Sequence, residues 1–373
     1  MPVPAPRYSE RDMAMMQRCL DLAARARGLT SPNPMVGAVV ARDGRVVAEA
    51  WHTRAGRPHA EALALHRAGA RARGATLYSN LEPCAHFGRT PPCVDAIVAA
   101  GIRKVVAAHI DPFSKVRGRG FAALRRSGVR VAVGLLAPQA RSLNEAYLTA
   151  ITRGRPLVIV KAAMTLDGRI ATARGASRWI SGAVSRRLVH MWRAQSDAIM
   201  VGARTVAADN PRLTARGRLG RQPQRIVVDA KLRIDPGCRM LSGRRGGQVI
   251  IYTVRGVSRS RRAALERVGA QVRCVPAGRG GVSLRAVMTD LAAHRVTQVL
   301  IEGGGELIAS ALHAGVVDRV ALFAAPLLLG GHRAVPLVGG RDARSLRHAI
   351  RLDGMTCRPS GTDLLIEARV VRS

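Results

Sequence analysis

One histidine, one glutamate and two cysteines have the spacing of a catalytic zinc site. His59 and Glu61 stand in the segment Pro58-His59-Ala60-Glu61, and Cys84 and Cys93 follow, with eight residues between them. A catalytic zinc ion takes three protein ligands and keeps one position for water, and an imidazole with two thiolates supplies that set. Glu61 is close to the ligands without being needed as one, so it can transfer protons. We therefore predict zinc-dependent hydrolysis of an amino group from a nitrogenous ring.

Two other interpretations of these residues remain open. A structural zinc site usually has four ligands, and His86 could be the fourth. The motif could also arise by chance, without a metal. The remaining cysteines lack partners at ligand spacing and are interpreted as small core residues: Cys19, Cys238, Cys274 and Cys357.

Short helices and strands must position the zinc ligands. A helix is expected from Ser9 to Gly28, because Ser9 can cap it and its apolar residues recur at helical spacing. Cys84 and Cys93 lie where helix N-termini are expected, and these ends favour thiolate charge. The other elements expected here are strands at 36–40, 46–50, 75–81, 104–108 and 130–133, and helices at 60–70, 94–100, 121–127 and 144–151. Their alternation predicts an α/β sandwich.

A change of pattern marks a domain boundary near the middle of the chain. Arg153-Gly154-Arg155-Pro156 interrupts the last of these helices, and the strongly β-forming run 157–161 follows. We predict two domains, residues 1–152 and 153–373, since domains have roughly 150 residues each. The second half repeats the α/β style, with further strands expected near 198–201, 225–229, 248–253, 298–301 and 319–324.

The composition is strongly basic, with a formal net charge of +36. Such a charge is typical of proteins that bind nucleic acid or anionic ligands. Only four of the 60 basic residues are lysines, however, and the arginines are scattered over both halves. A general preference for arginine explains this pattern as well as a partner does. The alternative function is a nucleic-acid base deaminase with a basic RNA-binding extension, but aromatic residues at 3% are too few for base stacking, so nucleic acid is not the expected partner.

Membrane association and a disulfide framework are not expected. No uninterrupted apolar run approaches the ~20 residues that span a bilayer, and the first residues lack the apolar segment of a signal peptide. We therefore expect a cytoplasmic protein. Its six cysteines are then better interpreted as metal ligands or core residues than as disulfide partners.

Further segments surround the zinc motif: Ser31-Pro32-Asn33-Pro34-Met35-Val36-Gly37, Trp51-His52, and Ala85-His86-Phe87-Gly88-Arg89-Thr90-Pro91-Pro92 between the cysteines. Together they resemble the deaminase half of the bifunctional riboflavin-biosynthesis deaminase/reductase family, whose cysteines have this long spacing. The resemblance implies a cytidine-deaminase-like α/β/α sandwich. It also implies a phosphorylated substrate, a diamino-oxo-pyrimidine with a ribosylamino 5′-phosphate, that loses its 2-amino group. The substrate site would be lined by Asn33, His52, His86 and Arg89.

The chemistry of two of these residues suits that role. The side-chain amide of Asn33 can both donate and accept hydrogen bonds at the edge of a ring. The guanidinium of Arg89 can donate two parallel hydrogen bonds to a phosphate. Asn33 also suits a simple turn before Pro34. One segment departs from the family pattern, because Asp111-Pro112-Phe113-Ser114 stands where the family usually has Asp-Pro-Asn-Pro. A polar substrate contact expected at position 113 is therefore missing.

The resemblance continues through the second half. It rests on the run 161–171, Ser177-Arg178-Trp179-Ile180, Arg193-Ala194-Gln195, the runs 201–205 and 209–211, Glu302-Gly303-Gly304 and the run 325–331. These segments are similar to the reductase half, which implies a dihydrofolate-reductase-like α/β domain and NADPH as cofactor. The implied reaction is hydride transfer to C1′ of the ribosyl group, which gives a ribityl chain.

The resemblance also assigns residues to the second site. Those implied to contact NADPH are Ala163, Trp179, Thr205, Asp209, Gly304, Gly305, Glu306, Leu307, Ile308, Ala309 and Ser310. Those implied to face the substrate are Ser177, Arg193, Leu213, Arg216 and Glu302. Arg193 and Arg216 suit a 5′-phosphate. Lys161 and Asp209 are candidate proton donors, although Asp209 also suits a turn before Pro211. We further expect a homo-oligomer, a dimer or a tetramer.

The glycines after the strand at 298–301 suggest a phosphate site without reference to any family. Glu302-Gly303-Gly304-Gly305 leads into a helix expected from Glu306, and N–H groups at a helix start bind phosphate. The segment is not G-x-G-x-x-G, so a Rossmann domain is not indicated. A tight turn without a ligand is the other interpretation.

Overall fold

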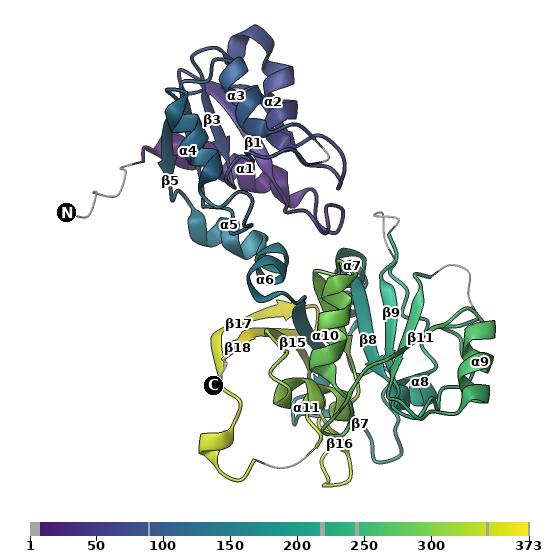
Figure 1. Ribbon diagram of the computed structural model, residues 1–373. Helices are drawn as coiled ribbons and strands as arrows, with labels where there is room; N and C mark the ends of the chain where they lie inside the picture. Colours follow the sequence, from purple (N-terminus) through teal and green to yellow (C-terminus); the bar gives the residue numbers. More distant parts are fainter. Residues whose placement is uncertain (1–7, 89, 217–220, 243–245, 341–342, 372–373) are drawn as a thin grey trace. The chain divides into compact units, whose positions relative to one another are not determined.

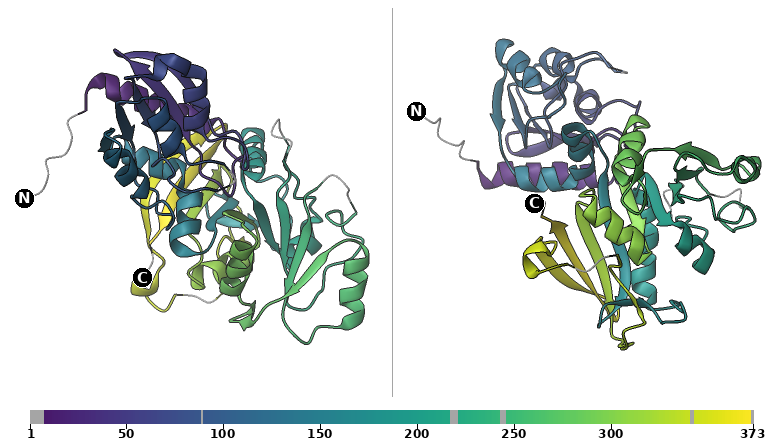
Figure 2. Two further views of the ribbon diagram at one scale, coloured as in Figure 1. Left: turned by 45° about the horizontal axis from the view of Figure 1, so that its top comes forward. Right: turned by 60° about the horizontal axis from the view of Figure 1, so that its bottom comes forward.

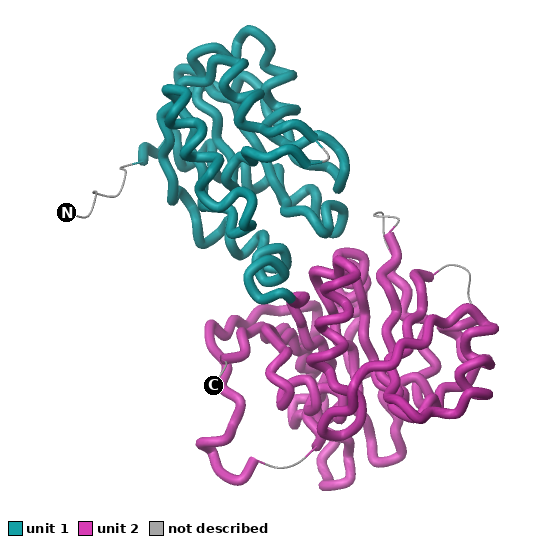
Figure 3. Tube along the Cα trace, viewed as in Figure 1, with its two compact units in different colours: residues 1–154 teal, residues 155–373 magenta. Residues whose placement is uncertain are grey.

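The computed structural model describes residues 8–88, 90–216, 221–242, 246–340 and 343–371 (Figure 1). The chain divides into two compact units, residues 1–154 and 155–373 (Figure 3). Both units have mixed α/β structure, as predicted. None of the helices in the described residues has the length and apolar character needed to cross a bilayer.

The first unit is a five-stranded sheet with helices on both faces. Its strand order is β2-β1-β3-β4-β5, in which β1 is antiparallel to both neighbours and β3, β4 and β5 are parallel. The strands are β1 Gly37–Arg42, β2 Arg45–Trp51, β3 Thr76–Ser79, β4 Lys104–Ala107 and β5 Arg130–Val133. The helices are α1 Glu10–Ala24, α2 Ala60–Ala68, η1 Gly69–Ala72, α3 Cys93–Ala99, α4 Arg119–Arg126, α5 Ala137–Leu143 and α6 Glu145–Arg153.

Alternating residues of the central strands build a core on each face of this sheet. Val40 and Leu77 pack on one side with residues of α2, α3 and α4, and Val39 and Tyr78 pack on the other with residues of α1 and α5. The expected sandwich is therefore confirmed. The sequence prediction missed α5, a short helix whose only buried residue is Ala140, so its apolar pattern is weak.

The second unit is a nine-stranded sheet in the order β11-β10-β9-β8-β14-β6-β15-β18-β17. The strands from β11 to β15 are parallel, and β18 and β17 continue the sheet as an antiparallel hairpin. These strands are β6 Leu157–Thr165, β8 Ala198–Gly202, β9 Gln224–Val228, β10 Val249–Thr253, β11 Gln271–Cys274, β14 Gln298–Glu302, β15 Arg319–Ala325, β17 Leu352–Ser360 and β18 Asp363–Val370.

Helices cover both faces of the large sheet. They are α7 Ala183–Gln195, α8 Ala203–Asp209, α9 Arg259–Arg267, α10 Leu284–Ala293 and α11 Gly305–His313, with a short η2 at Leu346–His348. Small two-stranded sheets join β7 Arg169–Ala171 to β16 Val335–Pro336 and β12 Ala277–Gly278 to β13 Gly281–Val282. The sequence prediction missed β11, β17 and β18. The case of β17 is clear, because it contains Gly354 and Pro359 and has only Ser360 buried.

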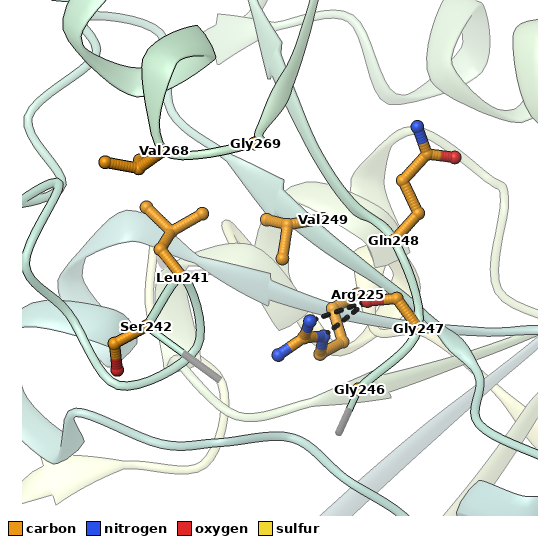
Figure 4. Close-up of a pocket in the computed structure, with 9 residues that line it drawn as sticks. All are labelled: Arg225, Leu241, Ser242, Gly246, Gly247, Gln248, Val249, Val268 and Gly269. Atoms are coloured by element: carbon orange, nitrogen blue, oxygen red, sulfur yellow. Dashed lines mark hydrogen bonds between the residues drawn. The ribbon is translucent and has the colours of Figure 1, made fainter. Parts of the chain in front are cut away.

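A cavity of about 270 Å³ lies where β9 and β10 begin (Figure 4). Arg225 lines it and is only 5% exposed. Its guanidinium donates to the carbonyl oxygen of Gly247, at 2.6 and 2.9 Å, and to that of Met240, at 2.6 Å. A Cβ on Gly246 would lie 2.4 Å from its Cζ atom. Arg225 therefore ties the segment before β10 to β9 through backbone carbonyl groups.

We expect Arg225→Lys to destabilise the second unit. A lysine ammonium cannot reach carbonyl groups on two segments at once, and hydrogen bonds to charged groups are each worth about 1.5–3 kcal/mol, so a loss of about 2–4 kcal/mol is expected. The measurement is thermal unfolding of the full chain. Arg255→Lys is the matched control, because Arg255 is exposed. Equal unfolding temperatures for the two variants would contradict this role.

Candidate functional site

Three predicted zinc ligands come together in the first unit. His59 is the N-cap of α2 and Cys93 is the first residue of α3. The Nδ1 atom of His59 lies 3.3 Å from Sγ of Cys93 and 3.5 Å from Sγ of Cys84, and all three atoms lie within 4.8 Å of one another. Ligands of one tetrahedral zinc ion are about 3.5–3.8 Å apart, given Zn–S and Zn–N bonds of about 2.3 and 2.0 Å. The donor set and its geometry thus fit zinc.

The cluster has three ligands among the described residues, and His86 is not one of them. That number is typical of a catalytic rather than a structural zinc site. The hydrogen bond with Cys93 and the nearby His59 lower the pKa of Cys84 well below its usual value. This shift favours the thiolate, the form that binds metal.

Glu61 lies beside the cluster on the first turn of α2. Its side chain is buried, and Oε2 accepts a hydrogen bond from Sγ of Cys93 at 3.7 Å. Burial raises the pKa of Glu61. A carboxyl group with a raised pKa next to a zinc site can accept and return a proton.

Two of the predicted substrate residues lie next to the zinc ligands. The Nδ2 atom of Asn33 is 3.1 Å from Nε2 of His52, and the other ring nitrogen of His52 is 3.1 Å from the carbonyl oxygen of Pro58. The rings of His52 and His59 meet edge to face, with centroids 5.4 Å apart. The structure thus joins the segments around positions 33, 52 and 59.

Two asparagines that the sequence analysis missed hold this arrangement. Asn144 accepts from the backbone N–H of Met35 at 2.7 Å, and Asn80 accepts from that of Gly37 at 2.8 Å. Asn80 directly follows β3, so a polar residue after a buried strand was the available signal. Asn144 lies more than 100 residues from its partner, and nothing local in the sequence indicates the contact.

Glu82 supports the other side of the site. Its buried carboxylate accepts hydrogen bonds of 2.9–3.2 Å from four backbone N–H groups, those of Asp111, Gly118, Gly120 and Phe121. Asp111 in turn accepts from the hydroxyl group of Tyr147 at 2.8 Å. These bonds hold the segment after β4 against the Glu82-Pro83-Cys84 motif.

Phe113, the residue that departs from the family pattern, lies against His86. The two rings meet edge to face with centroids 5.7 Å apart, and the backbone N–H of Phe113 donates to Asp111 at 2.9 Å. The Nδ1 atom of His86 is buried and has no hydrogen-bond partner among the described residues. Arg89, the fourth predicted substrate residue, lies outside the described residues. Thr90, which the sequence analysis did not single out, has Oγ1 3.4 Å from Nε2 of His59.

The second unit holds a buried cluster of charges. Lys161 on β6 and Glu302 at the end of β14 are register partners, with Nζ 3.8 Å from the carboxylate. Arg193 on α7 donates from Nε and Nη2 to both oxygens of Glu302, at 2.6 and 2.7 Å. Burial opposes ionisation of Glu302, but Arg193 and Lys161 outweigh it and lower its pKa. Burial lowers the pKa of Lys161.

The predicted substrate residues Leu213 and Arg216 lie in the segment after α8. Arg193 contacts this segment, because its Nη1 donates to the carbonyl oxygen of Thr214 at 3.3 Å. Leu213 is buried and Arg216 is exposed. Two nitrogen atoms of Arg193 already donate hydrogen bonds to Glu302. Of the two arginines, the exposed Arg216 is therefore better placed to bind a phosphate.

Residues predicted to contact NADPH lie around the start of α11. Gly303 and Gly304 both have φ above +80°, and a Cβ on Gly304 would lie 2.9 Å from Oγ1 of Thr205. No side chain of the described residues caps α11, and N–H groups at such a helix start can bind a phosphate. Leu307 and Ile308 are buried in the core, so a cofactor would meet their backbone rather than their side chains.

The other predicted contacts are distributed over neighbouring segments. Ser177 donates to Asp209 at 3.2 Å, which brings these two together. Trp179 is 69% exposed, with the guanidinium of Arg186 4.6 Å from its ring centroid. Ala163 lies on β6 two residues after Lys161, so the two side chains share a face of the sheet.

Comparisons with known proteins match both units. Residues 9–109 match the family model described as the cytidine and deoxycytidylate deaminase zinc-binding region, and residues 156–366 match the RibD C-terminal domain. Riboflavin biosynthesis protein RibD of Aquifex aeolicus is 38% identical over 358 residues, which is 96% of this chain and 98% of the relative. RibD of Escherichia coli is 40% identical over 332 residues, 86% and 89% of the two chains.

Solved structures of the same kind match nearly the whole chain. Acinetobacter baumannii RibD aligns with a TM-score of 0.87 at 33% identity, covering 97% of this chain and 99% of its own. The Thermotoga maritima diaminohydroxyphosphoribosylaminopyrimidine deaminase/5-amino-6-(5-phosphoribosylamino)uracil reductase aligns with a TM-score of 0.86 at 33% identity, covering 97% and 100%.

Proposed function

The chain belongs to the RibD family of bifunctional deaminase/reductases of riboflavin biosynthesis, and we propose that residues 1–152 form its zinc-dependent deaminase and residues 153–373 its NADPH-dependent reductase. The supporting observation is that each unit has its own cluster of chemically active residues. The first has His59, Cys84 and Cys93 with Glu61, and the second has the Glu302 cluster. The alternative, a base deaminase with an RNA-binding extension, is not favoured, since the RibD match covers both halves.

In the proposed deaminase, the substrate is 2,5-diamino-6-ribosylamino-4(3H)-pyrimidinone 5′-phosphate. Zinc, when bound, makes water nucleophilic at neutral pH. Glu61 holds the proton beside the reacting carbon and returns it to the leaving amino group. Asn33 and His52 orient the ring, and their hydrogen bond fixes both side chains relative to His59. His86 and Phe113 lie beside each other in the proposed pocket. The resemblance assigns Arg89 to the phosphate, and a guanidinium suits that ligand.

In the proposed reductase, NADPH supplies the hydride for C1′ of the ribosyl group. The start of α11 with Gly304 and Thr205 holds the cofactor phosphates, and Ala163, Trp179 and Asp209 provide further contacts. Ser177, Leu213 and Arg216 face the substrate, with Arg216 toward its 5′-phosphate. Lys161 is the proposed proton donor to the opened sugar, and burial, which lowers its pKa, favours donation.

The assay of each half-reaction tests this proposal. Purified, zinc-loaded protein should release one ammonia per pyrimidine substrate, and NADPH should be oxidised only after deamination or when the deaminated substrate is added. A protein that neither releases ammonia nor oxidises NADPH would contradict the proposal. Ammonia release without NADPH oxidation would support the deaminase role of the first unit and refute the reductase role of the second.

We expect Glu302→Gln to impair reduction alone. The neutral amide leaves Arg193 and Lys161 without their counter-charge, so both cations lose their fixed positions. A misplacement of about 1 Å in a site can cost about 100-fold in rate, and we expect a loss of that order in reductase kcat/KM. The measurement is NADPH oxidation with the deaminated substrate, with ammonia release as the internal reference. Glu266→Gln, in the exposed pair with Arg262, is the matched control. An unchanged rate of NADPH oxidation in Glu302→Gln would show that the Glu302 cluster takes no part in the reduction.

The proposal also includes the homo-oligomer expected from the resemblance, a dimer or a tetramer. Size-exclusion chromatography with light scattering tests it independently of both activities.

A further inference from the structure

The two ring nitrogens of His59 have different surroundings. Nδ1 lies 3.3 Å from Sγ of Cys93 and 3.5 Å from Sγ of Cys84, so it is the nitrogen that faces the proposed metal position. Nε2, the other nitrogen, lies 3.4 Å from Oγ1 of Thr90. A neutral imidazole carries one proton, and the nitrogen that binds metal cannot be the one that carries it. Nε2 is therefore the protonated nitrogen of a zinc-bound His59, and its N–H group needs an acceptor.

Thr90 supplies an acceptor for that N–H group. A hydroxyl oxygen has two lone pairs, so Oγ1 can accept from Nε2 of His59 and still donate its own proton. Imidazoles that bind metal almost always donate their second N–H to a partner of this kind, which fixes both the tautomer and the orientation of the ring. The contact between Nε2 and Oγ1 is therefore the one that a metal-binding imidazole requires.

The segment between the two cysteines returns Thr90 to the imidazole ligand. At its ends, the backbone N–H of Val94 donates to the carbonyl oxygen of Cys84 at 3.1 Å, and that of Cys93 donates to Sγ of Cys84 at 3.3 Å. Within it, the backbone N–H of Gly88 donates to the carbonyl oxygen of Thr90 at 3.2 Å. Backbone hydrogen bonds thus close this segment beside the metal ligands.

Two prolines connect Thr90 directly to a zinc ligand. The sequence here is Thr90-Pro91-Pro92-Cys93, in which Pro92 is buried and is the N-cap of α3. Each proline ring fixes its own φ and also restricts the residue before it. The backbone between Thr90 and Cys93 therefore has little freedom, and the hydroxyl group keeps its position relative to that ligand.

The imidazole of His59 has one other fixed neighbour. The ring of His52 meets it edge to face at 83°, and His52 is itself in contact with the carbonyl oxygen of Pro58 at 3.1 Å. Helices α2 and α3, which begin at His59 and Cys93, lie side by side on one face of the five-stranded sheet, in the blue part of Figure 2. An edge-to-face contact still lets a ring tilt, whereas a hydrogen bond at Nε2 fixes the direction of the Nδ1 lone pair.

We propose that Thr90 is the positioning residue of the zinc site. Its hydroxyl oxygen accepts the Nε2 proton of His59 and so holds the imidazole with Nδ1 toward the metal. The inference rests on the zinc site of the proposed function and adds the group that orients one of its ligands. It also gives the eight residues between the cysteines a role, because a shorter connection would leave no place for this hydroxyl group.

A pair of substitutions at position 90 tests the proposal in the full chain. Thr90→Val keeps the shape of the side chain and removes the oxygen, whereas Thr90→Ser keeps the oxygen and removes the methyl group. Competition with a chromophoric chelator should show zinc binding about 10- to 100-fold weaker in Thr90→Val, the usual effect of removing the partner of a ligand imidazole. Thr90→Ser should bind zinc like the parent chain. Thr152→Val, at an exposed position in α6, is the matched control and should also bind like the parent.

Cobalt(II) in place of zinc gives a second measurement that does not depend on activity. Its visible absorption reports on the geometry of the ligands, so the spectrum should change in Thr90→Val and keep the parent's form in Thr90→Ser. The metal-free forms of all these chains should unfold at the same temperature, because Thr90 is proposed to act through a metal ligand.

The outcomes separate the role of Thr90 from the zinc site itself. Equal zinc affinity in Thr90→Val and the parent would overturn the proposal, and so would a loss in Thr90→Ser as large as that in Thr90→Val. A metal-free Thr90→Val that unfolds well below the metal-free parent would make the role structural, which also overturns it. A parent chain that binds no zinc would refute the proposed deaminase site, whereas tight binding in both the parent and Thr90→Val would refute only the role of Thr90.

Discussion

Replacing Glu61 with Gln is expected to lower deaminase kcat about 100- to 10,000-fold, the range that general acid–base catalysis contributes. The carboxyl group is buried, and its Oε2 accepts a hydrogen bond from Sγ of Cys93, a proposed zinc ligand, at 3.7 Å. A glutamine keeps the shape and the hydrogen bond with Cys93 but cannot take up the proton. The loss should therefore appear in kcat rather than in substrate binding.

Two measurements on Glu61→Gln and one control variant distinguish catalysis from a structural defect. Zinc content should remain at one per chain, since Glu61 is not a ligand. Reduction of the deaminated substrate by NADPH should keep its parent rate. The control is Glu10→Gln, an exposed position in α1. If Glu61→Gln retained more than about a tenth of the parent kcat, the carboxyl group would fall outside the range of an acid–base catalyst.

Replacing Cys84 with Ser is expected to abolish deamination by removing the metal. Cys84 is one of the three proposed ligands, and a serine hydroxyl with a high pKa cannot replace a thiolate at neutral pH. Zinc content measured by mass spectrometry should fall well below one per chain, together with ammonia release. NADPH binding and reduction of the deaminated substrate should be unchanged, because all three proposed ligands lie in the first unit.

The matched control for Cys84→Ser is Cys274→Ser, which replaces an exposed cysteine with no metal partner. This variant should keep the parent's zinc content and its two activities. A metal chelator applied to the parent chain should reproduce the Cys84→Ser result, and added zinc should reverse it. If both activities disappeared in Cys84→Ser while far-UV circular dichroism remained unchanged, the assignment of one site to each unit would be wrong.

The zinc site was predictable because its information is local. His59 is the N-cap of α2, Glu61 lies in its first turn, and Cys93 starts α3, so spacing alone indicates a donor set. The alternating strands and helices were predictable for the same reason. Ser9, for example, caps α1 through a reciprocal pair of bonds with Asp12, as its residue type suggests.

Contacts within the site were predictable only in part. Asn33 and His52 are 19 residues apart in the sequence, and their side chains are in hydrogen-bond contact. Both residues were expected at the site from the family resemblance. The supporting roles of Asn80, Asn144 and Glu82 were not expected. Each of them binds backbone groups of a distant segment, and a backbone acceptor or donor has no signature in the sequence.

The sequence by itself therefore determined which groups could bind zinc, which carboxyl could move a proton, and that two α/β units follow each other. Only the tertiary structure decided what Arg193 and Lys161 contact, because Glu302 lies 109 residues from Arg193 and meets Lys161 only where β14 pairs with β6. It also decided that β17 stays exposed over most of its length. The physical reason is that pairing between distant strands depends on the whole sheet, whereas ligand spacing and helix capping depend on a few neighbouring residues.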